Sequence, residues 1–352
     1  MSKSRVIGLD VGTSAVRAAE MEFKGGAGDR GHPTLLRYGE VPLLPGAVQD
    51  GEVNQPETVA SAIKDLWRQN KFGTRDVIMG VGSRRVIVRE LELPFGPMAQ
   101  LRASLPFQVQ ELLPMPVEEA LLDYYPTGTY EGTTGKMVRG MLVAASKDSV
   151  RANIMAAESA GLRPQMVDLN AFALLRALAR DEFAEQVIAI VDIGARITTV
   201  VISAYGVPRF TRVLSVGGQD VTDAVAGHME ASAAEAEVLK REIGVGFATG
   251  PERAAGAAAV AEVTRSLVEA VRNTFVYYAS NNPGAGINQA LLTGGGSHLP
   301  GLGQYLASAS RLPTALGEPL RGVRVSQGVQ HTLPAHSSMV AVPVGLAYGA
   351  AA

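Results

Sequence analysis

Two short segments, far apart in the chain, combine an aspartate, a glycine and hydroxyl side chains directly after an apolar run. They are Asp10-Val-Gly-Thr-Ser and Asp192-Ile-Gly-Ala-Arg-Ile-Thr. A tight turn of this kind presents backbone N–H groups and hydroxyls, and its glycine lets an anion approach the main chain closely. The aspartate is placed to hold water or a magnesium ion. An ordinary Asp-Gly turn explains either segment alone, whereas two facing turns could clamp one phosphate chain.

Two further features have the composition of nucleotide contacts. Gly294-Gly-Gly-Ser297 joins an apolar strand to a helix, and glycines at such a place let the backbone lie flat on a planar ring or approach phosphates. The alternative is a plain glycine-rich connection. Glu237 and Lys240 are three residues apart and therefore share one helical face. Considered alone, they are expected to form a solvated surface pair.

The composition and several absent motifs exclude other kinds of chemistry. The 352 residues include 32 Lys and Arg against 34 Asp and Glu, so bulk positive charge does not favour nucleic acid as a partner. The absence of cysteine excludes disulfides, thiolate metal sites and cysteine nucleophiles. No histidine pair has i,i+4 spacing, no G-x-S-x-G motif occurs, and no G-x-G-x-x-G follows the first strand. Gly132-Thr-Thr-Gly-Lys136 lacks the spacing and the hydroxyl of a P-loop.

Neither end of the chain predicts a membrane anchor. Lys3 and Arg5 precede only a short apolar run, unlike a signal peptide. The apolar stretch from Met339 is shorter than the ~20 residues that a membrane helix needs. We therefore expect a soluble, cytoplasmic protein.

The elements that must position these segments alternate between strands and amphipathic helices, which predicts an α/β fold. The first part of the chain predicts, in order, strands 6–10, 15–23 and 35–41, a helix from Pro56 and a strand 76–81. The same order returns in strands 187–191, 197–203 and 207–213 and in a helix opened by Gly217 and Gly218. The two Asp-x-Gly segments thus occupy equivalent places in two β-β-β-α units, which indicates an internal duplication.

Residues 85–168 are predicted to form a module inserted between the two units. The module is expected to contain strands 86–93, 136–145 and 163–168 and helices 97–113 and 148–160, the first helix being disturbed by Pro106. The second unit is expected to carry helices 233–243 and 257–281, separated by a flexible loop over 244–256.

Together these pieces resemble the actin-like ATPase superfamily, in which two duplicated lobes close on a nucleotide. The resemblance covers nearly the entire chain and rests on residues 6–17 for the first phosphate motif, 190–198 for the second, and 292–297 for the adenosine motif. Residues 236–240 resemble the helix whose acid and lysine line the ribose and adenine. The resemblance implies that ATP or ADP binds with Mg²⁺, which Asp10 and Asp192 would hold mostly through water. The implied nucleotide contacts are Asp10, Gly12, Thr13, Ser14, Arg17, Asp192, Gly194, Ala195, Arg196, Thr198, Gly217, Gly218, Glu237, Lys240, Gly294, Gly295, Gly296 and Ser297.

Within this superfamily, the place of the inserted module near Arg85 resembles FtsA and PilM rather than actin or MreB. Residues 88–94, 107–120 and 122–124 closely resemble the type IV pilus assembly family PilM, and 142–147 and 161–168 continue that match. The implied domains are a first lobe core (1–84, 169–186 and 338–352), the inserted subdomain (85–168), a second lobe core (187–216 and 287–337) and its helical subdomain (217–286).

The resemblance to PilM also implies a partner. A PilN-like inner-membrane protein would place its N-terminal cytoplasmic tail beside the region Val86 to Leu113, and the chain would thus be held at the inner face of the membrane only indirectly. Self-association and other pilus platform or motor proteins are further candidate interactions. The alternatives are an FtsA-like cell-division filament protein and a small-molecule kinase of the same superfamily.

The sequence indicates the catalytic residues less clearly than the nucleotide contacts. Arg17 stands where actin has a lysine, so the charge is kept on a planar fork of donors. The resemblance identifies no residue that positions the attacking water. Asp168 and Asn170 lie near the corresponding crossover, but nothing local marks either as catalytic. The catalytic residue is therefore unassigned, with Asp168 as a candidate. We therefore expect at most a slow ATPase.

Overall fold

The first of two equivalent sheets carries the N-terminal motif. The computed structural model describes residues 3–24, 33–133, 135–247 and 250–349. The six-stranded sheet has the order β10(Arg163–Leu169)-β6(Asp76–Val81)-β1(Lys3–Val11)-β2(Ala15–Lys24)-β3(Thr34–Pro42)-β16(Arg324–Val325). Strands β1, β2 and β3 pair antiparallel, whereas β6 runs parallel to β1 and β10 parallel to β6.

The second sheet repeats this arrangement. Its order is β13(Val207–Leu214)-β12(Thr198–Ala204)-β11(Val187–Ile193)-β14(Gln289–Thr293)-β15(Thr314–Leu316). Strands β11, β12 and β13 pair antiparallel, and β14 and β15 add in parallel, as β6 and β10 do in the first sheet. The order 3-2-1-4-5 therefore occurs twice, and the predicted fold of two duplicated lobes is confirmed.

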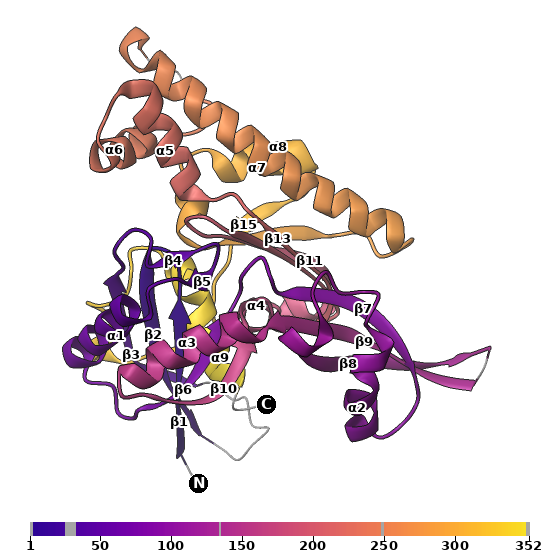
Figure 1. Ribbon diagram of the computed structural model, residues 1–352. Helices are drawn as coiled ribbons and strands as arrows, with labels where there is room; N and C mark the ends of the chain where they lie inside the picture. The colour runs from indigo at the N-terminus through magenta and orange to yellow at the C-terminus, as the bar shows by residue number, and fades with distance from the viewer. Residues whose placement is uncertain (1–2, 25–32, 134, 248–249, 350–352) are drawn as a thin grey trace.

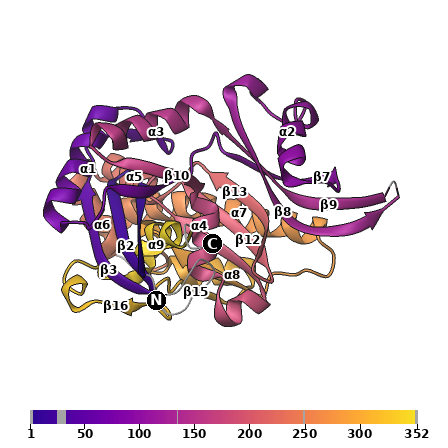
Figure 2. The same cartoon turned by 90° about the horizontal axis from the view of Figure 1, so that it is seen from below.

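Two short helices separate the lobes. Helices α4 (Asn170–Leu178) and α9 (Ala341–Gly349) pack on each other between the sheets, near the centre of Figure 2. Their apolar side chains share one core with Ile78 of the first sheet and Ile188 of the second. A Cβ added at Gly345 would lie 1.9 Å from the Ala173 carbonyl oxygen, so only glycine permits this close helix contact.

Helices cover the outer face of each sheet (Figure 1). Helices α1 (Pro56–Asn70) and α3 (Lys147–Ser159) lie on the first lobe, next to the hairpin β4(Val48–Gln49)-β5(Glu52–Val53). The second lobe carries α5 (Gly218–Met229), α6 (Ala233–Ile243), α7 (Ala254–Asn281) and α8 (Leu302–Ser310). The apolar stripe on α7 from Val260 to Tyr278 is buried, apart from the half-buried Val263. The expected loop over 244–256 is shorter than predicted, because α7 begins at Ala254.

The inserted module is a small sheet with one helix. Its strand order is β7(Ile87–Pro94)-β9(Gly135–Ser146)-β8(Ala120–Gly132), and α2 (Met98–Gln108) covers one face. The helix predicted over 97–113 ends at Gln108, soon after Pro106 removes a backbone donor. Strand β8 was not predicted from the sequence. In Figure 1 the hairpin of β8 and β9 extends away from the rest of the molecule.

The end of the predicted module belongs structurally to the first lobe. Strand β10 pairs with β6 in the first sheet, and α3 packs on α1 there. The expected inserted unit 85–168 therefore includes two elements, α3 and β10, that are built into the first lobe. Their apolar side chains pack in the core of that lobe and also against β9 of the small sheet.

None of the helices in the described ranges combines the length and the apolar character that a membrane span requires.

Candidate functional site

The two predicted Asp-x-Gly turns come together between the lobes. Asp10 lies at the end of β1 and Asp192 at the end of β11, the central strands of the two sheets. Burial raises the pKa of Asp10 to about 6, with Arg17 opposing this shift. Burial also raises the pKa of Asp192 to about 7, and the negative charge of Asp10 adds to this effect. The two carboxyl groups are thus close enough to repel each other, and a cation between them would relieve that repulsion.

Glycines bring three loops of the second lobe into contact beside Asp192. A Cβ added at Gly294 would lie 2.6 Å from Asp192 Oδ1, and one added at Gly218 would lie 3.3 Å from the Gly296 Cα. A Cβ added at Gly217 would lie 2.5 Å from the carbonyl oxygen of Gly194. The predicted glycine-rich segments therefore form one cradle, and its glycines have no side chains to block a planar or anionic ligand.

Several predicted ligand groups are already hydrogen-bonded within the protein. The hydroxyls of Thr198 and Ser297 donate to the carbonyls of Val216 and Gly294, both at 2.7 Å. The backbone N–H groups of Gly218 and Gln219 donate to the carbonyls of Gly194 (2.9 Å) and Ala195 (2.7 Å). These groups hold the cradle together.

The remaining predicted contacts differ in whether their polar side chains already have a partner within the protein. Arg196 forms ion pairs with Asp220, at 2.7 Å, and with Asp223 on α5. By contrast, the hydroxyls of Thr13 and Ser14 form no hydrogen bond with the described residues, and Ser14 is exposed. Of the predicted hydroxyl ligands, these two are available for a bound phosphate.

Glu237 and Lys240 on α6, a solvated pair when considered alone and nucleotide contacts by the resemblance, belong to a partly buried network. The Lys240 Nζ donates to Glu237 at 2.6 Å, to the Thr222 hydroxyl at 2.9 Å and to the Gly218 carbonyl at 3.1 Å. Lys240 is only 8% exposed. Although burial opposes ionisation, hydrogen bonds from Lys240 and Thr222 hold the pKa of Glu237 below its usual range. The network ties α6 to the start of α5, beside the cradle.

The catalytic candidate Asp168 is engaged in a structural pair. Its carboxylate accepts hydrogen bonds from the Arg176 guanidinium and, at 2.7 Å, from the Leu169 N–H. Asn170, two residues further, lies over Gly80 and Gly82, where an added Cβ would approach its amide to 2.1 and 2.8 Å. The Asn170 Oδ1 atom is buried and has no hydrogen-bond partner within the described residues. A bound ligand or water in the cleft would satisfy this atom.

Two contributors to the site were not predicted from the sequence. Glu40 on β3 holds the Arg17 guanidinium, and Ser338 bridges to the adenosine motif by accepting from Thr293 through its carbonyl and contacting His298 at 2.8 Å. Strand alternation in 34–42 could have placed Glu40 on the Arg17 face, but no local motif marks either residue.

Replacing Asp192 by asparagine should stabilise the ligand-free protein at alkaline pH. In the folded state the pKa of Asp192 is about 7, against 3.8 in the unfolded chain, so the folded state loses stability as the pH rises through this interval. Asp192→Asn removes the cost of a buried charge, on the order of 3 kcal/mol at pH 8. Urea unfolding in EDTA should show a gap between variant and wild type that widens from pH 5 to pH 8. An equal pH dependence for both proteins would contradict the assignment.

Two matching sheets with helices between them, and paired Asp-x-Gly turns at the cleft, define a protein with the actin-like ATPase fold. MreB5 of Spiroplasma citri bound to ADP shares this fold, with a TM-score of 0.55 and 14% identity over 97% of this chain and 94% of that one. The chain belongs to the family of the type IV pilus assembly protein PilM, whose family model matches residues 8–350. The family predicted from the sequence is thereby confirmed.

Two further relatives are consistent with this family. A PilM-PilN type IV pilus biogenesis complex contains a chain with a TM-score of 0.86 and 27% identity, covering 99% of both chains. The cell division protein FtsA of Bacillus subtilis (strain 168) is 26% identical in an alignment 263 residues long that covers 68% of this chain. That match spans only 58% of the length of FtsA.

Proposed function

We propose that this chain binds a magnesium–adenine nucleotide between its lobes and serves as a scaffold in type IV pilus assembly. In this proposal the inserted module holds the N-terminal cytoplasmic tail of a PilN-like inner-membrane protein, which keeps the chain at the inner face of the cell membrane. Family membership and the similarity to the PilM-PilN complex support the role in pilus assembly over the FtsA-like alternative.

The observation that carries nucleotide binding is the pair of buried carboxyl groups, Asp10 and Asp192, at the ends of the central strands β1 and β11, where the charge of Asp10 raises the pKa of Asp192. When ionised, these two carboxylates and Glu40 outweigh the guanidinium of Arg17, which lies beside Asp10 and Glu40. Phosphates alone would therefore be repelled, whereas a magnesium–phosphate complex would be attracted. Within the described residues, no group of three or more acidic or histidine side chains could hold a metal ion. This suits magnesium, which keeps several waters and binds through one or two carboxylates and the phosphates.

Isothermal titration calorimetry tests this part of the proposal directly. Magnesium–ATP and magnesium–ADP should both bind, and removing magnesium with EDTA should weaken binding by at least about tenfold, or ~1.4 kcal/mol. Binding that is indifferent to magnesium would remove the two aspartates from the proposed role.

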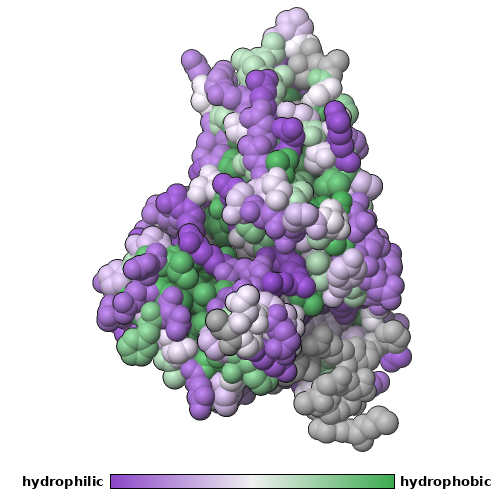
Figure 3. All heavy atoms as spheres, turned by 90° about the vertical axis from the view of Figure 1, so that its right-hand side faces the viewer, coloured by the Kyte–Doolittle hydropathy of each residue, from purple (hydrophilic) through white to green (hydrophobic). Residues whose placement is uncertain are grey.

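The module offers features that suit an extended peptide. Among the described strands, β7 pairs only with β9, and its start lies close to β13 of the second lobe. The part of its other edge beyond that contact can accept an added strand. Phe95, just before α2, and Phe107, in its last turn, are 55% and 80% exposed. In Figure 3 the end of the molecule that carries the inserted module faces the viewer. Apolar side chains gather in the lower left part of this view. A bound tail could thus combine backbone hydrogen bonds with apolar contacts.

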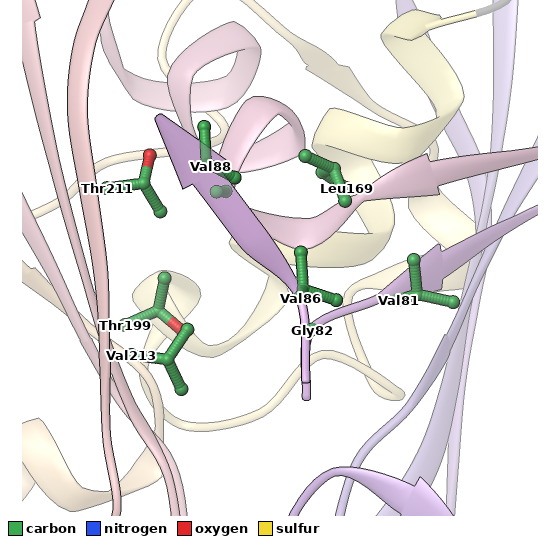
Figure 4. Close-up of a pocket in the computed structure, with 9 residues that line it drawn as sticks. Val81, Gly82, Val86, Val88, Leu169, Thr199, Thr211 and Val213 are labelled. Atoms are coloured by element: carbon green, nitrogen blue, oxygen red, sulfur yellow. The ribbon is translucent and has the colours of Figure 1, made fainter. Parts of the chain in front are cut away.

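The first strand of the module also touches the second lobe. A cavity of about 30 Å³ separates Val86 and Val88 from Thr199, Thr211 and Val213 of the second sheet (Figure 4). The Arg84 Nη1 donates to the Ser215 hydroxyl at 3.3 Å across the same junction. Because the module contacts the second lobe at this junction, closure of the lobes on a nucleotide would shift β7. This contact provides a route by which nucleotide and tail affinity could be linked.

ATP hydrolysis by the isolated protein should be slow or undetectable. The Asp168 carboxylate is ion-paired with the Arg176 guanidinium, and the amide of Asn170 cannot accept a proton as a general base. A coupled phosphate-release assay should give a rate for Asp168→Asn that matches the wild type. Robust turnover that disappears in Asp168→Asn would promote Asp168 to a catalytic residue and contradict this prediction.

A further inference from the structure

Three charged side chains form a row across neighbouring strands at the edge of the cleft. Asp10 on β1 lies opposite Arg17 on β2, which in turn lies opposite Glu40 on β3. Residues directly opposite one another on adjacent strands project from the same face of the sheet. The row therefore ends at the first Asp-x-Gly turn, where the proposed nucleotide phosphates would lie.

Glu40 holds one complete edge of the Arg17 guanidinium. Arg17 Nε and Nη2 donate to the two Glu40 carboxylate oxygens at 3.0 and 3.1 Å. The buried Tyr38 hydroxyl donates to the same carboxylate at 3.1 Å, which fixes Glu40 in turn. A planar fork bound at two points has little rotational freedom. The direction of the remaining donors is thus set by Glu40.

The free edge of Arg17 points toward the phosphate turn without closing on Asp10. Arg17 Nη1 is 3.9 Å from Asp10 Oδ2, at the outer limit of an ion pair. A Cβ added at Gly12 would lie 3.3 Å from the same Nη1, so the glycine leaves room for this donor. Asp10 keeps its carboxylate available, and Arg17 keeps donors available, at the same end of the row.

We propose that Glu40 is a positioning residue for nucleotide binding. It holds Arg17 away from Asp10, so that the Asp10 carboxylate remains free for hydrated magnesium while the Nη1 edge of Arg17 faces the phosphates. Without this restraint, Arg17 would pair directly with Asp10 and compete with the metal. The inference rests on the proposed function, because it assigns a role within the same nucleotide site.

The central test is a double-mutant cycle of Glu40→Gln and Arg17→Gln in the full-length protein, measured by calorimetry with ADP over a series of magnesium concentrations. Glu40→Gln should lower the affinity for magnesium–ADP about tenfold and should shift the magnesium midpoint upward. In the Arg17→Gln background, Glu40→Gln should cause no further loss, since its effect passes through Arg17. Glu40→Asp should recover part of the affinity, which also shows that the site tolerates substitution.

A matched control distinguishes positioning from a merely structural ion pair. Asp76 holds Arg163 by the same two-point geometry at 2.7 and 3.2 Å, in the same sheet but away from the cleft. Asp76→Asn should change neither the affinity nor the magnesium midpoint. Unchanged magnesium dependence in Glu40→Gln, or equal losses in both Arg17 backgrounds, would overturn the inference while leaving the proposed function intact. A wild-type protein that binds no adenine nucleotide would refute both.

Discussion

Asp10→Ala should lower the affinity for magnesium–ATP by about 10- to 100-fold, the usual effect of removing a group that orients a bound metal or its waters. The protein should stay folded, because burying the ionised Asp10 carboxylate costs desolvation free energy and an alanine at this position does not. Calorimetry at saturating magnesium measures the affinity, and thermal unfolding checks the fold. This is the largest effect that the proposed phosphate site predicts for a single side chain.

The control for Asp10 is an exposed acid of the same lobe. Among the residues that the structure describes, Asp65 forms only an i,i+3 pair with Arg68 on the surface of α1, at 2.8 Å. Asp65→Ala should therefore bind magnesium–ATP as the wild type does. If Asp10→Ala also binds as tightly as the wild type, Asp10 does not belong to the site.

Phe107→Ser should weaken binding of the PilN-like tail by about tenfold or more. A synthetic N-terminal tail peptide is expected to bind the wild type at about 1 µM or tighter, ~-8 kcal/mol. Phe107 is 80% exposed and contributes little to the fold, so a partner that covers it gains about 1.5–3 kcal/mol of burial. Fluorescence anisotropy of the labelled peptide measures the loss, and nucleotide affinity should not change.

An exposed apolar residue on the other lobe provides the comparison. Leu316 on β15 is 46% exposed, and Leu316→Ser should bind the peptide normally. Equal weakening by both substitutions would indicate nonspecific adhesion of the peptide. Normal binding by Phe107→Ser would place the tail elsewhere on the molecule.

Local sequence predicted those elements whose signals are local. Strand 76–81 and helix 233–243 have the bounds that the sequence predicts. The strand is a short apolar run, and a capping box marks the start of the helix, with Ser232 and Glu235 bonded reciprocally. Strand β8 escaped prediction because Pro126 and Gly128 interrupt its pattern at a bulge, and only its pairing with β9 sustains it.

The residues of the candidate site also divide into those that local sequence marks and those that only the packing of the fold brings together. The two aspartates and the glycines of the cradle stand out in the sequence because they follow apolar strands. The partner of Arg17 does not, because Glu40 lies 23 residues further along the chain and only the pairing of β2 with β3 brings it opposite Arg17. Likewise, Glu237 and Lys240 look like a surface pair in the sequence, whereas the packing of α5 against α6 buries Lys240 and leaves Glu237 half-buried.

Hydrogen exchange of the full-length chain, with and without the tail peptide and magnesium–ATP, tests the central claim most directly. The proposal predicts that the nucleotide protects the turns after β1 and β11, whereas the peptide protects β7 and α2. The protection of β7 and α2 by the peptide should also change when nucleotide is present, since linked sites affect each other reciprocally. Protection of α7 by the peptide, with residues 87–108 unchanged, would contradict the claim that the inserted module holds the partner.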